Sequence, residues 1–161
     1  MMKIAIYGRE FNNTVLPYVQ DVFDVLSLYN VDALVYEKYH HFISDKVKLN
    51  AKITTFKENA ELIGQADVLI SLGGDGTMLD TLALVRDSGI PVIGINFGRL
   101  GFLASINKDE IKKAIEALLN QQYALDSRSL LSLESKLHLF GEENFALNDI
   151  TIHRRDNSAM M

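Results

Sequence analysis

The 161-residue chain contains no cysteine. A disulfide framework and a thiolate metal site are therefore excluded, and the composition fits a reducing cytosol. Long apolar runs are also missing: none approaches the roughly 20 residues that span a bilayer. The opening residues, MMKIAIYG, turn polar too early for a signal peptide. We therefore expect a soluble, cytoplasmic protein with no membrane partner.

Positive charge is scarce, since 16 lysines and arginines stand against 21 aspartates and glutamates, which gives a net charge of -5. This balance argues against nucleic acid as a partner. An anionic ligand would have to be held by backbone donors and a few well-placed cations. The histidines His40, His41 and His153 do not stand at ligand spacing, so no metal site is expected from protein side chains alone.

The order of apolar runs and helical patterns predicts an α/β fold, a Rossmann-like, mostly parallel sheet with flanking helices. Strands are expected at 3–7, 33–36, 53–56, 67–72 and 92–96, and helices at about 14–29, 59–64, 78–87 and 109–119, with 37–49 either a loop or a weak helix. Ligands of such sheets gather at the carboxyl ends of the strands. With 48% hydrophobic residues, the chain can bury one good core.

The pattern changes near Gln122, where alternating apolar residues replace the helical spacing. Residues 125–139 and 145–153 are typical of antiparallel strands separated by a polar turn. We therefore divide the chain into an α/β nucleotide-binding domain, 1–121, and the incomplete start of a β-rich domain, 122–161.

The stretch SLGGDGT, residues 71–77, joins a predicted strand to a predicted helix. Its glycines, Gly73, Gly74 and Gly76, allow a ligand to approach the backbone, and the amides of a helix N-terminus favour anions. Asp75 places a negative charge in the same turn, which indicates phosphoryl transfer with Mg²⁺ or a substrate hydroxyl facing the carboxylate. The alternative is a structural turn in which Asp75 or Thr77 only caps the helix.

The glycine turn differs from two better-known phosphate motifs. No lysine follows its last glycine, as a GxxxxGK[ST] P-loop requires, and it lacks the spacing of GxGxxG. A ligand of this turn would therefore be held by an arrangement that differs from both motifs.

Two further segments carry candidate ligand contacts. In GINFGRLGFL, residues 94–103, Asn96 offers a hydrogen-bond donor and an acceptor. Arg99 can bind a phosphate, and Phe102 can face an adenine ring. The alternative is a loop whose apolar side chains pack into the core, which we favour for Leu103. In ALNDIT, residues 146–151, Asn148 and Asp149 are poor strand formers inside a predicted strand, which favours a functional role over a bulge or tight turn.

Taken in order, GGDGT, GINFGRLGFL and ALNDITIHR resemble the NAD kinases, which phosphorylate the 2′-hydroxyl of the adenosine ribose of NAD to give NADP. The resemblance covers the chain from Lys3 onward. GGDG alone also occurs in lipid kinases of the diacylglycerol type and in phosphofructokinases, and the asparagine–acid pair separates this family from them. At residue 149 the family often has glutamate, so Asp149 has a shorter reach.

The resemblance implies roles for individual residues and for ligands. Asp75 matches the catalytic carboxylate, and Gly73, Gly74, Gly76 and Thr77 match the phosphate-facing loop. Asn148 and Asp149 match the pair that holds NAD, while Leu100 and Phe102 match apolar contacts near adenosine, and Asn96 and Arg99 belong to the same set of contacts. The donor would be ATP with Mg²⁺ or another divalent metal, and the resemblance also implies a homo-oligomer.

Family members continue beyond the point that corresponds to Met161, so we expect this length of chain to be inactive alone. Two alternatives remain open. The chain could be a non-catalytic nucleotide-binding domain, or a lipid or sugar kinase of the GGDG type. Nothing in the sequence distinguishes ATP from polyphosphate as donor, or NAD from NADH as acceptor.

Overall fold

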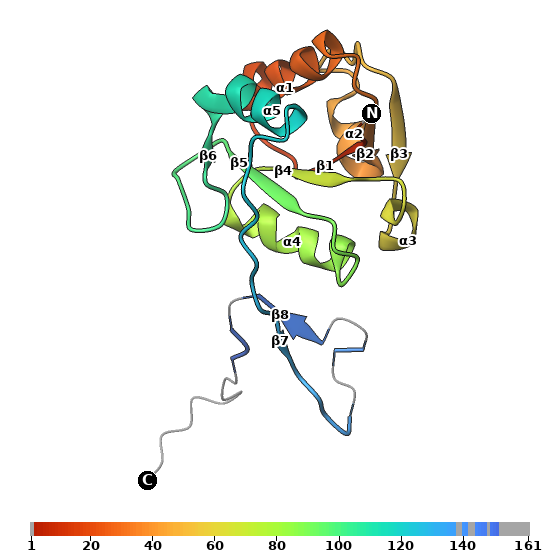
Figure 1. The fold of residues 1–161 in the computed structure, drawn as a ribbon, viewed down its shortest axis with the longest axis vertical. Coiled ribbons are helices and arrows are strands. Elements are labelled where there is room, and N and C mark those ends of the chain that lie inside the picture. The colour runs from red at the N-terminus through yellow and green to blue at the C-terminus, as the bar shows by residue number, and fades with distance from the viewer. Residues whose placement is uncertain (1, 138–139, 142–143, 148, 152–161) are drawn as a thin grey trace. The chain divides into compact units, whose positions relative to one another are not determined.

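The computed structural model describes residues 2–137, 140–141, 144–147 and 149–151. The chain divides into two compact units, Met1–Leu125 and residues 126–161, which are described separately below (Figure 1).

The first unit is built on one six-stranded sheet in which every neighbouring pair is parallel. Its order is β3-β2-β1-β4-β5-β6. The strands are β1 (Ile4–Gly8), β2 (Ala33–Tyr36), β3 (Ile53–Phe56), β4 (Val68–Leu72), β5 (Val92–Asn96) and β6 (Ile106–Asn107). The predicted Rossmann-like α/β fold is therefore confirmed, and the strands expected at 33–36, 53–56 and 92–96 have the predicted bounds.

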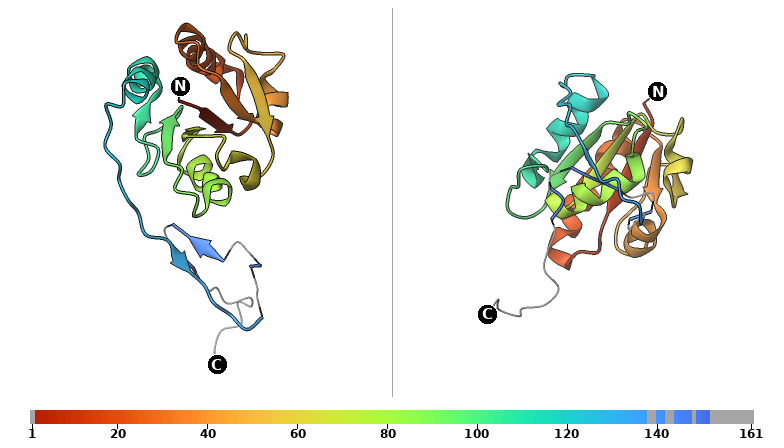
Figure 2. Two further views of the ribbon diagram at one scale, coloured as in Figure 1. Left: turned by 45° about the vertical axis from the view of Figure 1, so that its right-hand side comes forward. Right: turned by 90° about the horizontal axis from the view of Figure 1, so that it is seen from below.

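Helices cover both faces of the sheet (Figures 1 and 2). They are α1 (Leu16–Leu28), α2 (Glu37–Ile43), α3 (Asn59–Leu62), α4 (Asp75–Val85) and α5 (Ile111–Leu119), with short 3₁₀ turns at Asn13–Val15 and Lys108–Glu110. The segment 37–49, which the sequence left between loop and helix, begins with α2. The two-residue strand β6 was not predicted, because its apolar pattern is too short to be recognised.

Alternation along the strands divides the core between the two faces. On β1, Ile4 and Ile6 pack with the apolar sides of α1, α2 and α5, whereas Ala5 packs with the side chains of α3 and α4. All three are fully buried. Because every second residue of a strand faces the same side, a strand that is covered on both faces is apolar throughout. This explains the continuous apolar run of β1.

Helix α4 begins three residues earlier than the sequence indicated. Gly74 is extended, with φ -91° and ψ -166°, and is the N-cap, while Asp75, Gly76 and Thr77 form the first helical turn. The backbone N–H groups of Thr77 and Met78 both donate to the carbonyl of Gly74. The sequence pattern places Gly76 in the turn before the helix, but a glycine in the first helical turn has no intrahelical N–H bond to lose. The loop is therefore shorter, and Asp75 lies on the helix.

The second unit contains less regular structure than expected. Its strands are β7 (Leu131–Ser132) and β8 (Phe145–Ala146), which pair antiparallel. The antiparallel pairing confirms the sequence pattern, but the extents predicted at 125–139 and 145–153 were wrong over the described residues. Alternation of apolar residues alone does not ensure a long strand, because a two-stranded sheet is only marginally stable by itself.

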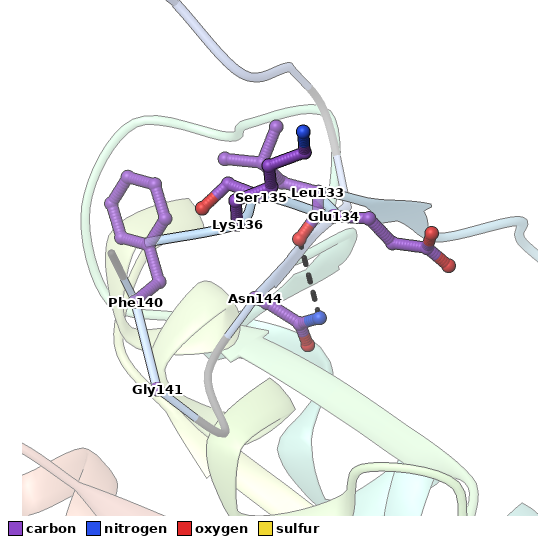
Figure 3. A pocket seen from close by; sticks show the side chains of 7 residues that line it. All are labelled: Leu133, Glu134, Ser135, Lys136, Phe140, Gly141 and Asn144. Carbon is purple, nitrogen blue, oxygen red and sulfur yellow. Dashed lines mark hydrogen bonds between the residues drawn. The ribbon is translucent and has the colours of Figure 1, made fainter. Parts of the chain in front are cut away.

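A pocket of about 490 Å³ lies within the second unit (Figure 3). Asn144 borders it and donates from Nδ2 to the carbonyl of Leu133 at 3.3 Å. The lining residues are Leu133, Glu134, Ser135, Lys136, Phe140, Gly141 and Asn144. None of them is a residue for which the sequence predicted a role.

Over the part of the chain that the structure describes, every helix is too short or too polar to span a bilayer.

Two tyrosines of the first unit differ in how their hydroxyl groups are satisfied. Tyr39 is 2% exposed, and its Oη has no hydrogen-bond partner among the described residues. Burial also raises the pKa of Tyr39, so its hydroxyl stays neutral. Tyr7 instead donates from Oη to Asp80 Oδ2 at 3.0 Å.

Tyr39→Phe should therefore raise the free energy of unfolding by about 1 kcal/mol, because it removes an unsatisfied buried hydroxyl. The matched variant Tyr7→Phe should lower it by about 1 kcal/mol, because it removes a hydrogen bond that is made. Urea unfolding of both variants measures this difference in sign. Equal destabilisation by both would mean that the Tyr39 hydroxyl has a partner in solution.

Candidate active site

The glycine turn lies where the strand order of the sheet reverses. The chain builds outward from β1 to β2 and β3 on one side, and from β4 to β5 and β6 on the other. Gly8 at the end of β1 pairs with Leu72 at the end of β4. The segments that follow these two strands therefore begin next to each other. In open α/β sheets this position, at the carboxyl ends of the strands, is where ligands bind.

The backbone of the glycine turn presents unpaired donors. The N–H groups of Gly74, Asp75 and Gly76 donate to no described residue, whereas Gly73 N–H donates to the carbonyl of Ile95 at 3.0 Å. A Cβ placed at Gly74 would meet no atom within 4 Å. Free amides at the N-terminus of a helix attract anions through both hydrogen bonding and the helix dipole. The turn can therefore accept a phosphate group.

The side chain of Thr77, unlike these amides, is buried. It is 7% exposed and lies against the backbone of Gly73, where a Cβ would overlap it. The side chain of Thr77 therefore packs against the turn in this structure.

The carboxylate of Asp75 accepts hydrogen bonds from the loop that follows β5. Oδ2 accepts from the N–H of Phe102 at 2.8 Å, and Oδ1 accepts from the N–H groups of Leu103 and Ala104, each at 3.0 Å. The amides of Ala104 and Phe102 are the main causes that lower the pKa of Asp75, with Leu103 adding to them and partial burial opposing them. Asp75 is therefore held as an anion.

This arrangement contradicts the structural alternative for the turn. The N-cap of α4 is Gly74, and no side chain makes a capping hydrogen bond there. Asp75 uses its oxygens on a different loop, so neither Asp75 nor Thr77 caps the helix.

Asn96 and Arg99 shape the loop in different ways. Asn96 is 3% exposed; its Nδ2 donates to the carbonyl of Arg99 and its Oδ1 accepts from the N–H of Gly98, both at 2.8 Å. Its side-chain amide is thus engaged within its own loop. The side chain of Arg99 is exposed.

Two apolar side chains of this loop lie in solvent. Phe102 is 94% exposed and Leu100 is 62% exposed, although the N–H of Phe102 donates to Asp75. Leu103 is half-buried and Ala104 fully buried. Exposing large apolar side chains is unfavourable in the free protein, and those beside a polar site are available to cover the flat face of a ligand.

Sequence reasoning missed a polar cluster beside the turn. Arg9 follows β1 and forms a two-pronged ion pair with Asp80 of α4, with both N–O distances 2.5 Å. Tyr7 donates to the same carboxylate, and burial, with Asp80 next, raises the pKa of Tyr7 to about 12. Arg9 Nη1 lies 3.9 Å from the position of a Cβ at Gly76, so a cation borders the glycine turn. Only the pairing of β1 with β4 reveals this cluster.

Two predicted site residues belong to the second unit. Asn148 lies outside the described residues, and Asp149 is exposed. The roles predicted for them stay predictions.

Comparison with known proteins identifies relatives of this chain. A family model described as the ATP-NAD kinase N-terminal domain matches residues 4–123. A protein of Flavobacterium johnsoniae named NAD kinase is 40% identical over 99% of this chain and 55% of its own length. A Bacteroides fragilis protein of the same name is 36% identical over 99% of this chain and 54% of its own. The chain thus spans about half the length of the curated relatives it matches.

A solved structure is similar in fold. The crystal structure of yeast NADH kinase complexed with NADH matches 81% of this chain and 41% of its own, with a TM-score of 0.68 and 21% sequence identity. This likeness supports the fold of the α/β unit independently of sequence.

The hydrogen bonds to Asp75 predict a pH-dependent contribution to stability. A depressed pKa in the folded state stabilises above the pKa of the unfolded chain, and this contribution is lost as the pH falls through the folded pKa. Asp75→Asn should therefore unfold at lower urea than the parent at pH 7, because the amide's Nδ2 cannot accept a hydrogen bond. The difference should shrink as the pH falls below 3.8, the ordinary pKa of aspartate.

Asp21→Asn is the control, since Asp21 is exposed on α1 and bonds to no described residue. A difference between Asp75→Asn and the parent that stayed constant from pH 7 to pH 3 would contradict the ionised, amide-bound carboxylate.

Proposed function

The chain belongs to the ATP-NAD kinase family, and from this premise we propose that it contributes the catalytic residues of an enzyme that transfers the γ-phosphoryl group of ATP to the 2′-hydroxyl of the adenosine ribose of NAD. The observation that carries the proposal is the position of Asp75. An ionised carboxylate stands at the N-terminus of α4 beside unpaired amides, at the point where the strand order reverses. Phosphoryl transfer mainly requires such positioning and electrostatics.

The donor phosphates would lie against the N–H groups of residues 74–76, with the guanidinium of Arg9, just after β1, beside them. Gly74 and Gly76 support this placement, because the space where their Cβ atoms would lie is open. Asp80 bonds Nε and Nη2 of Arg9 and so orients the guanidinium, which leaves Nη1, the nitrogen nearest Gly76, to meet a phosphate oxygen.

Mg²⁺ would enter as the complex with ATP. No group of three or more histidines, aspartates and glutamates gathers within the described part of the chain, so the protein offers no cage of its own there. Mg²⁺ commonly keeps phosphate and water ligands and takes few from protein. The donor set therefore fits an ion carried by the nucleotide.

The acceptor's adenosine would lie on the exposed ring of Phe102, with Leu100 beside it. A ribose hydroxyl would then lie near Asp75, a position supported by the hydrogen bond from the Phe102 N–H to that carboxylate. The hydroxyl oxygen attacks the γ-phosphorus, the bond from phosphorus to the ADP oxygen breaks, and the hydroxyl proton passes to Asp75. Asn148 and Asp149 are proposed, from the resemblance alone, to hold NAD. A homo-oligomer is proposed on the same basis.

The experiment compares the 161-residue chain with a chimera that adds the part of the Flavobacterium johnsoniae relative outside the matched 162 residues. Each is incubated with ATP, Mg²⁺ and NAD, and NADP is measured by an NADP-specific dehydrogenase. The chimera should form NADP, and Asp75→Asn in it should lower the rate by about 10² to 10⁴-fold, the usual contribution of acid–base catalysis.

The other candidate functions have distinct outcomes in this experiment. A chimera that binds nucleotide without turnover would favour a non-catalytic binding domain. Phosphorylation of a diacylglycerol or a sugar without NADP formation would favour a lipid or sugar kinase.

Phe102→Ala tests the adenosine contact. It should raise the KM for NAD about tenfold, because stacking of a base on an aromatic ring contributes about 1 to 3 kcal/mol. The KM for ATP and the free energy of unfolding should not change, since the ring is 94% exposed. Tyr123→Ala, which removes another exposed ring, is the control. An unchanged KM for NAD would place the adenosine elsewhere.

A further inference from the structure

The loop after β5 turns its backbone, rather than a side chain, towards the carboxylate of Asp75. Consecutive amides of residues 102–104 donate to it, one to Oδ2 and two to Oδ1. A carboxylate has about four acceptor positions, two on each oxygen. The two bonds fill Oδ1, so the remaining position is on Oδ2.

Residue 101 allows this contact because it has no side chain. A Cβ at Gly101 would overlap the Asp75 carboxyl, so any other residue would push the loop and the carboxylate apart. Gly98, in the same loop, is different: a Cβ there would come no closer than 3.7 Å to its nearest neighbour, Asn96 Oδ1, which is ordinary contact. The close approach is therefore specific to Gly101.

We propose that Gly101 is a positioning residue for Asp75: it brings the amides of residues 102–104 onto the carboxylate, which fixes the plane of the carboxylate and leaves one acceptor position, on Oδ2, for the substrate hydroxyl. This deepens the proposed function and rests on it. It also gives Phe102 two roles, since its ring would meet the adenosine while its N–H holds Oδ2. Binding of the acceptor and orientation of the carboxylate are thereby linked through one residue.

The arrangement favours an oriented carboxylate that is ionised before the reaction, rather than a strong base. Charged groups on the neighbouring elements are Arg9 and Asp80, which pair with each other, and Arg99, which precedes Gly101 in the loop. The causes that lower the pKa of Asp75 are the backbone amides, Ala104 first, and include none of these charges. In a loose phosphoryl-transfer transition state there is little need for early proton removal, so an oriented acceptor suffices.

A titration of the 161-residue chain tests the geometry without any activity. The ¹⁵N-labelled amides of residues 102, 103 and 104 should shift together on acidification, with one midpoint below 3.8. In Asp75→Asn this common transition should disappear. Amides that titrate separately, or a common midpoint at or above 3.8, would overturn the proposal before any variant at Gly101 is made.

Gly101→Ala should raise the Asp75 midpoint towards 3.8, because the amides can no longer reach the carboxylate. Gly98→Ala, the matched change in the same loop, should leave it unaltered. In the chimera, Gly101→Ala should lower kcat by about 10²-fold, the cost of misplacing a reacting group by about 1 Å. The KM for ATP should stay constant, and the acidic limb of the pH profile should move to higher pH, as the pKa of Asp75 rises.

Failure of this inference and failure of the proposed function give different results. If no NADP forms while the three amides titrate as expected, the proposed function is wrong and the geometry stands. If NADP forms and Gly101→Ala keeps the parent kcat and pH profile, the positioning role is wrong and the kinase stands.

Discussion

The contact between the Asp75 carboxylate and the amides of residues 102–104 is the constraint on which the candidate site depends. It ties the β4–α4 turn to the loop that follows β5, two segments separated by a helix and a strand. Both ends of the contact are tightly packed. Gly101 gives the loop room to reach the carboxylate, and Gly94 of β5 lies so close to Ala104 that a Cβ would come within 2.7 Å of its Cα. A shift of either segment would therefore be felt by the other, as expected in a close-packed interior.

The glycines around the site fall into two groups with different physical reasons. Gly73, Gly94 and Gly101 are required by the fold itself, because a side chain at each would overlap a neighbouring residue. Gly74 and Gly76 have no such neighbour, and their open space lies beside amides without a described partner. Only the second group points to a ligand. The sequence alone does not distinguish these two groups among the five glycines.

The sequence predicted the sheet well because its strands are short, apolar and bounded by turn residues. β2, β3 and β5 have the predicted bounds, and the glycine turn was located by the junction of a strand and a helical pattern. What it could not predict depends on contacts between distant residues. The partners of Asp75 lie 27 to 29 residues away, and the Arg9–Asp80 pair joins residues 71 apart. The internal bonds of Asn96 were also hidden, because an asparagine that holds its own loop and one that holds a ligand look alike in a sequence.

The strand order has a consequence for how the protein folds. β1 lies between β2 and β4, so it has only β2 beside it until the chain has grown past residue 72. The loop that holds Asp75 emerges still later, with Ala104. Closing such distant segments is entropically costly and slows folding. During synthesis on the ribosome, one edge of β1 therefore has no partner until β4 has been made, and the hydrogen bonds to Asp75 are complete only after Ala104 has been added.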